Sequence, residues 1–189
     1  MRRSTINQAI SKATACFHAY HWSLPPNPLW DVTDFGLGDF SSYGLVLVNL
    51  AEEEEYCEKL MYASRKQRTP VHAHKVKKED IRVRMGELSI QLWCGRPDRP
   101  QAESFSLKRN REEMTLSHGE VVTLAAGERI TIPPGIFHEF WPESDSCIIG
   151  EVSTANDDLN DNYFINPDIG RFSEVIEDEP RLLKLVSDN

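Results

Sequence analysis

Two histidines and a glutamate in one short segment have the residue types and spacing of a metal-binding site. His72 and His74 are separated by one residue, and Glu79 follows His74 after four more. On a β-strand the two histidines would point to the same face, because side chains alternate along a strand. The basic residues after His74 can turn the chain, so that a return strand carries Glu79 against the two imidazoles. Gly86 follows after six further residues and marks the next turn.

A second segment has the same character and supplies a third histidine. Gly127 is followed after five residues by Pro133, after one more by Gly135, and after two more by His138. We predict a strand over Glu128–Ile132 that enters the Pro-Pro-Gly turn, since proline and glycine end strands. The chain then returns carrying His138, whose imidazole could meet the first two inside a barrel.

The two segments together predict one metal centre. Its predicted ligands are His72, His74, Glu79 and His138. Three imidazoles and one carboxylate suit Mn, Fe, Ni, Co or Zn. On an octahedral ion these ligands leave two positions open, as catalytic sites do. A histidine pair without the rest of the pattern would more often be ordinary core or surface residues. We interpret His18 and His21 as packing or surface residues and His118 as a loop residue, because they lie outside the pattern.

The spacing of these residues resembles the two motifs of the cupin superfamily, H-x-H-x4-E-x6-G and G-x5-P-x-G-x2-H. Two positions depart from the family pattern: Lys66 stands where the first motif begins with glycine, and Pro142 where the second ends with asparagine. Both positions shape turns and do not ligate metal. The resemblance implies a jelly-roll β-barrel with the ligands inside it.

Further segments resemble the D-lyxose isomerase family, from about Asp34 to Arg171. They are Asp34-Phe35-Gly36-Leu37-Gly38, Lys77-Lys78-Glu79, Gly150-Glu151-Val152-Ser153 and Asp161-Asn162-Tyr163-Phe164. The resemblance implies an aldose–ketose isomerase that uses a divalent metal, usually Mn²⁺, with Co²⁺, Ni²⁺, Fe²⁺ or Zn²⁺ as alternatives. Such enzymes interconvert D-lyxose with D-xylulose, and often D-mannose with D-fructose. The resemblance to cupins of this size also implies a homodimer.

Aldose–ketose isomerisation needs a base beside the metal. A metal with two open positions can chelate the C1 carbonyl and the C2 hydroxyl, which stabilises a cis-enediol intermediate. A base must then take the C2 proton and return it to C1. Glu151 is our candidate, because a carboxylate among apolar strand residues is unusual without a partner. Lys77 could act on the oxygen at C1 as a catalytic or substrate-binding partner, and Asp161 and Phe164 are further candidates for substrate binding.

Simpler interpretations of these residues stay open. Glu151 could be a solvated carboxylate at a strand edge, Lys77 a solvated member of a basic run, and Asp161 part of an acidic loop. Two rival functions are also compatible with a cupin metal site. One is an oxygenase or decarboxylase, and the other is a non-enzymatic sugar-sensing cupin. Turnover of an unphosphorylated aldose by the metal-loaded protein separates the isomerase from both.

Short elements must position these residues. Apolar positions three and four apart predict an N-terminal helix over Ser4–Tyr20, with Ser4 or Thr5 as its cap. The later apolar runs are short and bounded by turns, which favours an all-β cupin-type barrel over a parallel α/β sheet. The predicted strands are Gly44–Leu50, Glu58–Tyr62, Ile81–Met85, Leu88–Trp93, Val121–Leu124, Ile130–Ile132 and Cys147–Val152. We expect one domain over residues 1–189, with a helical extension over 1–30 and a C-terminal helix or arm over 172–189.

Composition narrows the classes of protein. The chain has 189 residues, 40% of them apolar, and a net charge of −9. This length permits a hydrophobic core, and the acidic balance argues against binding nucleic acid or an anionic membrane surface. No apolar run approaches the roughly 20 residues of a membrane span, and the N-terminus does not resemble a secretory signal. Four scattered cysteines are typical of a reduced, cytoplasmic protein.

Overall fold

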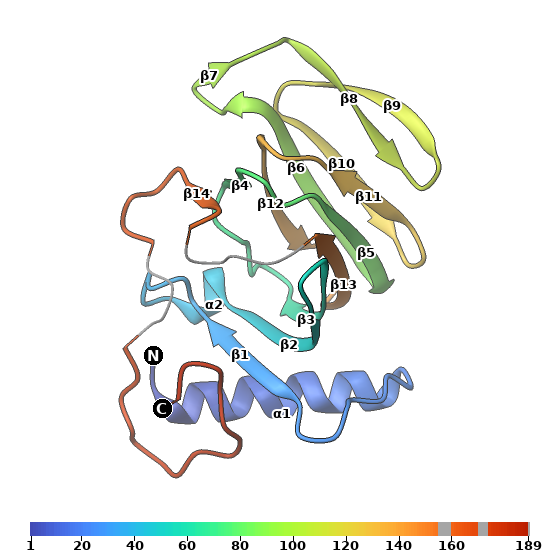
Figure 1. Ribbon diagram of the computed structural model, residues 1–189. Coiled ribbons are helices and arrows are strands. Elements are labelled where there is room, and N and C mark those ends of the chain that lie inside the picture. Colours follow the sequence, from blue (N-terminus) through green and yellow to red (C-terminus); the bar gives the residue numbers. More distant parts are fainter. Residues whose placement is uncertain (155–159, 170–173, 189) are drawn as a thin grey trace.

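The computed structural model describes residues 1–154, 160–169 and 174–188. One long helix precedes a series of short strands (Figure 1). The helices are α1 (Arg3–Ala19) and α2 (Phe40–Tyr43), and the strands are β1 (Leu29–Thr33), β2 (Leu45–Glu52), β3 (Tyr56–Ser64), β4 (His72–His74), β5 (Glu79–Met85), β6 (Glu87–Arg96), β7 (Arg99–Pro100), β8 (Ser104–Arg109), β9 (Glu112–Ser117), β10 (Glu120–Ala125), β11 (Arg129–Ile132), β12 (Ile136–Pro142), β13 (Ser146–Thr154) and β14 (Asn162–Phe164).

The strands form two antiparallel sheets. The larger has the order β1-β2-β3-β13-β5-β11-β8-β9, and the smaller has the order β10-β6-β12-β4-β14, with β7 paired to β6. Side chains of both sheets meet in one apolar core, which includes Met61, Ile81 and Ile149 from the larger sheet and Ile90 and Phe140 from the smaller. The predicted all-β architecture is therefore confirmed, and the core between the sheets fixes which side chains face inward.

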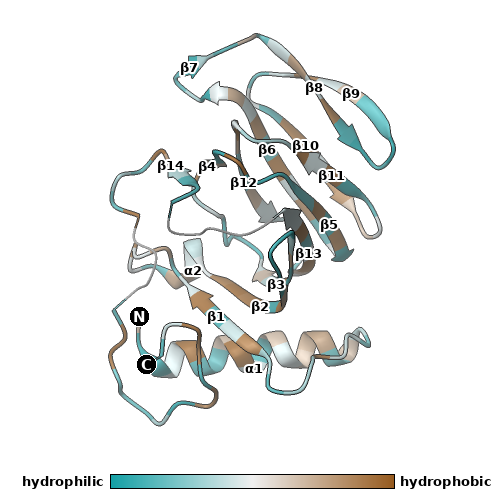
Figure 2. Cartoon of the chain, viewed as in Figure 1, coloured by the Kyte–Doolittle hydropathy of each residue, from teal (hydrophilic) through white to brown (hydrophobic). Residues whose placement is uncertain are grey.

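Helix α1 covers the outer face of the larger sheet near β1, β2 and β3 (Figure 1). Apolar residues recur along it among hydrophilic ones (Figure 2), and the stripe that contains Ile6, Ile10 and Phe17 is buried. The ring of Phe17 stacks on Trp30 at 6.3 Å between centroids. The strands beneath α1 are thus buried on both faces, with alternate residues in this second core and in the core between the sheets.

The start of α1 is held by the C-terminal residues and not by the predicted cap. The helix begins after Arg2, which makes no side-chain capping bond, so the expectation that Ser4 or Thr5 caps it is wrong. Asp178 instead accepts hydrogen bonds from the Ser4 backbone amide at 2.9 Å and from its hydroxyl at 2.7 Å. A carboxylate from a distant segment therefore satisfies a free amide of the first turn.

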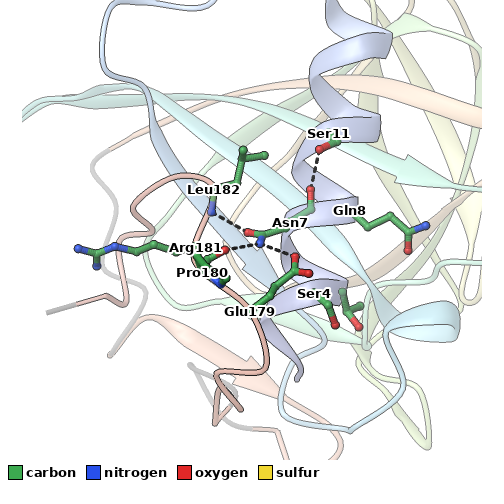
Figure 3. Close-up of a pocket in the computed structure, with 9 residues that line it drawn as sticks. Ser4, Asn7, Gln8, Ser11, Glu179, Pro180, Arg181 and Leu182 are labelled. Carbon is green, nitrogen blue, oxygen red and sulfur yellow. Dashed lines mark hydrogen bonds between the residues drawn. The ribbon is translucent and has the colours of Figure 1, made fainter.

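The C-terminal segment is an arm along α1 and β1, so of the two predicted forms the structure has the arm. Its described part, residues 174–188, makes a bridge between Ile176 and Arg2 and another between Leu185 and Trp30. Asn7 ties α1 to this arm: its Nδ2 donates to Glu179 at 2.6 Å and its Oδ1 accepts from the Leu182 amide at 2.9 Å (Figure 3). A hollow of about 750 Å³ between α1 and the arm is lined mostly by polar residues, among them Ser4, Asn7 and Glu179.

The turns of the first motif have left-handed backbone. Gly86 has φ +85°, which glycine adopts freely, and its predicted turn is confirmed. Lys66 has φ +77°, although it carries a side chain. The structure therefore keeps a glycine-like conformation where the family pattern has glycine and this chain has lysine. None of the helices in the described ranges is long and apolar enough to cross a membrane.

Candidate active site

Three histidines meet on the inner face of the smaller sheet. His72 and His74 lie two apart on β4, and His138 on β12 is paired with His72 in the strand register. Each offers a ring nitrogen, and these nitrogens all lie within 4.8 Å of one another. Adjacent antiparallel strands thus bring together residues that are more than sixty positions apart in the sequence.

Backbone carbonyls orient two of these rings. His72 Nδ1 donates to the Pro70 carbonyl at 2.8 Å, and His138 Nδ1 donates to the Ile136 carbonyl at 3.1 Å. Donation from Nδ1 leaves the lone pair of a neutral ring on Nε2, the form that binds metal. Burial, together with the neighbouring His138 and His74, holds the pKa of His72 well below its usual value. His72 is therefore neutral near pH 7.

Glu79 reaches the histidines from the larger sheet. It lies at the start of β5, with Oε1 2.8 Å from His138 Nε2 and Oε2 3.5 Å from His74 Nε2. Burial alone would raise the pKa of Glu79, but Lys77 and His138 lower it well below the usual range. The residue is therefore an ionised carboxylate. The structure brings together all four predicted ligands, three from one sheet and one from the other.

The buried polar atoms of this cluster fit a metal ion. Both ring nitrogens of His74 are buried without a hydrogen-bond partner among the described residues, and Oε1 of Glu79 and Nε2 of His138 are buried with only each other nearby, at 2.8 Å. Unpartnered buried polar atoms are costly, and ligation of a cation would satisfy these. Three imidazoles and a carboxylate are a donor set for a divalent transition metal.

Lys77 links the cluster to Glu151. Its Nζ lies 3.0 Å from Glu79 Oε2 and 3.0 Å from Glu151 Oε1. Lys77 is 5% exposed and Glu151 is 6% exposed, so the alternatives in which either is a solvated surface residue are wrong. Burial alone would lower the pKa of Lys77, but Glu151 and Glu79 raise it above its usual value. The lysine is therefore a fixed cation between two carboxylates.

Asp161 and Phe164 support the histidines. Asp161 is buried; its carboxylate accepts from the backbone amides of Val76 at 2.7 Å and Lys77 at 3.0 Å, and Oδ2 lies 3.7 Å from His74 Nδ1. Asp161 thus holds the segment that carries Lys77 and lies beside His74, and its role in substrate binding stays a prediction. Phe164 stacks on His72 at 5.6 Å between centroids and lines the cavity.

The cavity at this site has a volume of about 100 Å³. It is lined by the four predicted ligands, Lys77, Glu151 and Phe164, and also by residues that our sequence analysis missed, among them Phe35, Lys59 and Thr69. Lys59 is 5% exposed and lies on β3 in the same phase as Met61. The sequence alone does not show that phase, because β3 carries buried apolar residues on both faces.

Two antiparallel sheets around an inward-facing cluster of three histidines and a glutamate define a cupin. Solved structures agree on the fold. The L-ribose isomerase of Cellulomonas parahominis aligns with a TM-score of 0.70 and 17% identity over 93% of this chain and 98% of that one. An Acinetobacter L-ribose isomerase in complex with L-ribose aligns with a TM-score of 0.69 and 16% identity over the same shares.

Sequence comparison gives the family. The D-lyxose isomerase family matches residues 27–189. A D-lyxose/D-mannose isomerase from Escherichia coli is 32% identical over 100% of this chain and 98% of its own length. Another from Serratia proteamaculans is 34% identical over 95% and 94%. The chain belongs to the D-lyxose isomerase family and is an isomerase. The match extends beyond the expected span of Asp34–Arg171 and includes the C-terminal arm.

Proposed function

We propose that this isomerase interconverts D-lyxose and D-xylulose, and also D-mannose and D-fructose, through a cis-enediol. The single observation that carries the proposal is the buried carboxylate of Glu151, held by Lys77 beside the histidine cluster. The names of the relatives, which are D-lyxose/D-mannose isomerases, support the choice of sugars.

The residues that would hold the metal are His72, His74, Glu79 and His138, with Mn²⁺ as our candidate and Co²⁺, Ni²⁺, Fe²⁺ or Zn²⁺ as alternatives. When bound, the ion would supply Lewis-acid polarisation of the sugar carbonyl. The neutral state of His72 and the ionised state of Glu79 suit both residues to ligation without a prior proton change.

Glu151 would move the proton. Its carboxylate accepts the proton from C2, becomes a carboxylic acid, and returns the proton to C1, while the hydroxyl proton on O2 passes to O1. The Lys77 ammonium, 3.0 Å from Glu151 Oε1, holds the carboxylate in place. Its raised pKa keeps Lys77 protonated, so it serves as a charge partner and hydrogen-bond donor and not as the base. Burial of both groups keeps bulk water away from the acid form.

A sugar panel tests this function. The protein is stripped of metal, reconstituted with one divalent ion at a time, and assayed on unphosphorylated aldoses. We expect turnover of D-lyxose and D-mannose to their ketoses, with the highest rate in Mn²⁺. Absence of turnover of any aldose with any ion would overturn the proposal. Oxygen consumption or decarboxylation would favour the rival cupin enzymes, and sugar binding without turnover would favour a sensor.

We also propose a cytoplasmic homodimer. All four cysteines are free in the structure, as a reducing compartment requires. Light scattering coupled to size-exclusion chromatography would give the subunit count, and a monomer mass would contradict the dimer.

A further inference from the structure

Lys59 is a buried cation that the mechanism above does not use. It lies on β3, and its neighbours in the same phase, Met61 and Ala63, belong to the core between the sheets. Its side chain therefore faces the interior. Lysine is seldom buried, because removing an ammonium from water is costly unless other groups compensate. Lys59 lines the cavity at the histidine cluster, and we therefore ask what its ammonium group does there.

Lys59 is a direct neighbour of the proposed base. It is paired with Glu151 in the register of β3 and β13, and Ile81 of β5 is paired with Glu151 on the other side. Directly paired residues on antiparallel strands project to the same face, with Cβ atoms about 5 Å apart. Lys77 reaches Glu151 from the segment between β4 and β5. Glu151 thus has one lysine on a neighbouring strand and another at hydrogen-bond distance.

Lys59 lies on the apolar side of a cavity whose other sides carry polar residues, among them Thr69, Glu151 and Asn162. The cavity residues that come from β2, β3 and the turn after β1 are Phe35, Leu45, Lys59 and Met61. An open-chain sugar placed with C1 and C2 between the histidine cluster and Glu151 carries hydroxyls on its remaining carbons. Against Leu45, Met61 or Phe35 these hydroxyls would lose their hydrogen bonds to water without replacement. An ammonium has three donors, so Lys59 can keep a protein partner and still donate to a sugar oxygen.

We propose that Lys59 binds a hydroxyl of the sugar beyond the reacting carbons and so contributes to substrate specificity. This inference rests on the proposed isomerase function and adds the residue that recognises the unreacting part of the chain. A site built to donate to a hydroxyl discriminates strongly against an analogue that lacks it, since one hydrogen bond is then lost and no water replaces it.

A cycle of enzyme and substrate changes tests the contact. The Lys59→Met variant and the native enzyme are assayed on D-lyxose and on analogues that lack the hydroxyl at C3, C4 or C5. For one analogue we expect the native enzyme to lose about 10- to 100-fold in kcat/KM, the range for a hydrogen bond to a charged group. The same analogue should cost Lys59→Met less than about threefold, because the donor is already absent.

Controls separate substrate contact from structural damage. A purely structural defect lowers kcat/KM for all substrates alike, and equal penalties for every analogue in both enzymes would overturn the inference. Lys108→Met is the matched control, since Lys108 is exposed on β8, and it should retain the native penalties. If Lys59→Met does not fold or lacks metal, Lys59→Gln, which keeps an N–H donor, is used, and it should retain part of the penalty. If the native enzyme turns over D-lyxose but both enzymes show equal penalties, only the proposed role of Lys59 is rejected. If the native enzyme turns over no aldose, the proposed function is rejected, and this inference with it.

Discussion

Three charged site residues alternate in sign beside His138. Glu79 lies 2.8 Å from His138, Lys77 lies 3.0 Å from Glu79, and Glu151 lies 3.0 Å from Lys77. Each buried group is compensated by the next, and removal of one would leave another unpaired, which is typically more costly than loss of the pair as a whole. Lys77 thereby couples the predicted metal ligands to the predicted base without being either.

Alanine at each predicted ligand should weaken metal binding. Replacing His72, His74, Glu79 or His138 by Ala removes a donor that water cannot hold in place as well, so affinity should fall by more than about tenfold. Elemental analysis of dialysed protein measures the metal content. The matched control is His118→Ala, outside the cluster, which should keep native content. Full occupancy in all four variants would contradict the assignment.

Glu151→Gln should separate catalysis from metal binding. The amide keeps the shape but cannot accept a proton, so kcat should fall by a factor on the order of 10²–10⁴ with metal content unchanged. In D₂O the native enzyme should place deuterium at the carbon that receives the proton. Near-native turnover of the variant with no deuterium in the product would favour a hydride shift. Deuterium with a fully active variant would keep the enediol and require another base.

At the scale of elements, the arm and α1 are joined through one guanidinium. Arg3 is 2% exposed and bonds Glu177 at 2.6 Å and Asp188 at 2.6 Å. Hydrogen bonds from Arg3 lower the pKa of Glu177, and they outweigh the burial that would raise the pKa of Asp188, which is also lowered. The arm is therefore attached by carboxylates that must stay ionised.

Acid should loosen this attachment. A carboxylate with a lowered folded pKa contributes stability that is present above its unfolded pKa, roughly 4, and is lost as pH falls through the folded value. In Arg3→Met both pKa values return toward normal, so the denaturation midpoint should fall at pH 7 and depend less on pH below roughly 4. Urea titrations from pH 7 to 3 measure this. Arg2→Met is the control, because its guanidinium is exposed and 3.5 Å from Asp178. Parallel pH profiles for native protein and Arg3→Met would refute the role of Arg3.

The turn after β3 carries strain that glycine would relieve. Left-handed backbone costs a residue with a side chain about 1–2 kcal/mol, and Lys66 has φ +77°. Part of this stabilisation is offset, because glycine has more conformational freedom than lysine in the unfolded chain. Lys66→Gly should therefore raise the free energy of unfolding by about 0.5–1 kcal/mol. The adjacent Arg65→Gly should lower it, and a loss of stability in Lys66→Gly would show that the side chain makes a compensating contact.

At the scale of the whole molecule, two cores stabilise the fold independently of the site. One lies between the sheets and the other under α1, and both consist of apolar side chains. The stripped protein should therefore keep its far-ultraviolet circular dichroism. Its melting midpoint should lie roughly 5–10 °C below that of the loaded protein, the usual effect of a ligand that binds only the folded state. A stripped protein that is unfolded at 25 °C would contradict this.

The features that could be predicted from the sequence are those set by residues close together in the chain, such as motif spacing, turns and runs of apolar residues. The ligand spacing, the turn at Gly86 and the apolar strand around Glu151 were all readable in this way. The hairpin of β8 and β9 was missed because it is polar, with Leu107 and Leu116 as its buried residues. The cap at Ser4 was wrong because its acceptor lies 174 residues away. Lys59 was missed because its meaning depends on which residue faces it across the sheet.

The site spans both sheets. The three histidines belong to the smaller sheet, whereas Glu79 and Glu151 belong to the larger one. Enzymatic activity therefore depends on the distance between the two sheets. Far-ultraviolet circular dichroism instead reports the secondary structure within each sheet. On heating, a slight widening of that gap would misplace acid and metal ligands before either sheet melts. Packing between the sheets would then set the temperature and the time over which the enzyme stays active. Substitutions meant to extend its active lifetime should therefore be made at the interface between the sheets.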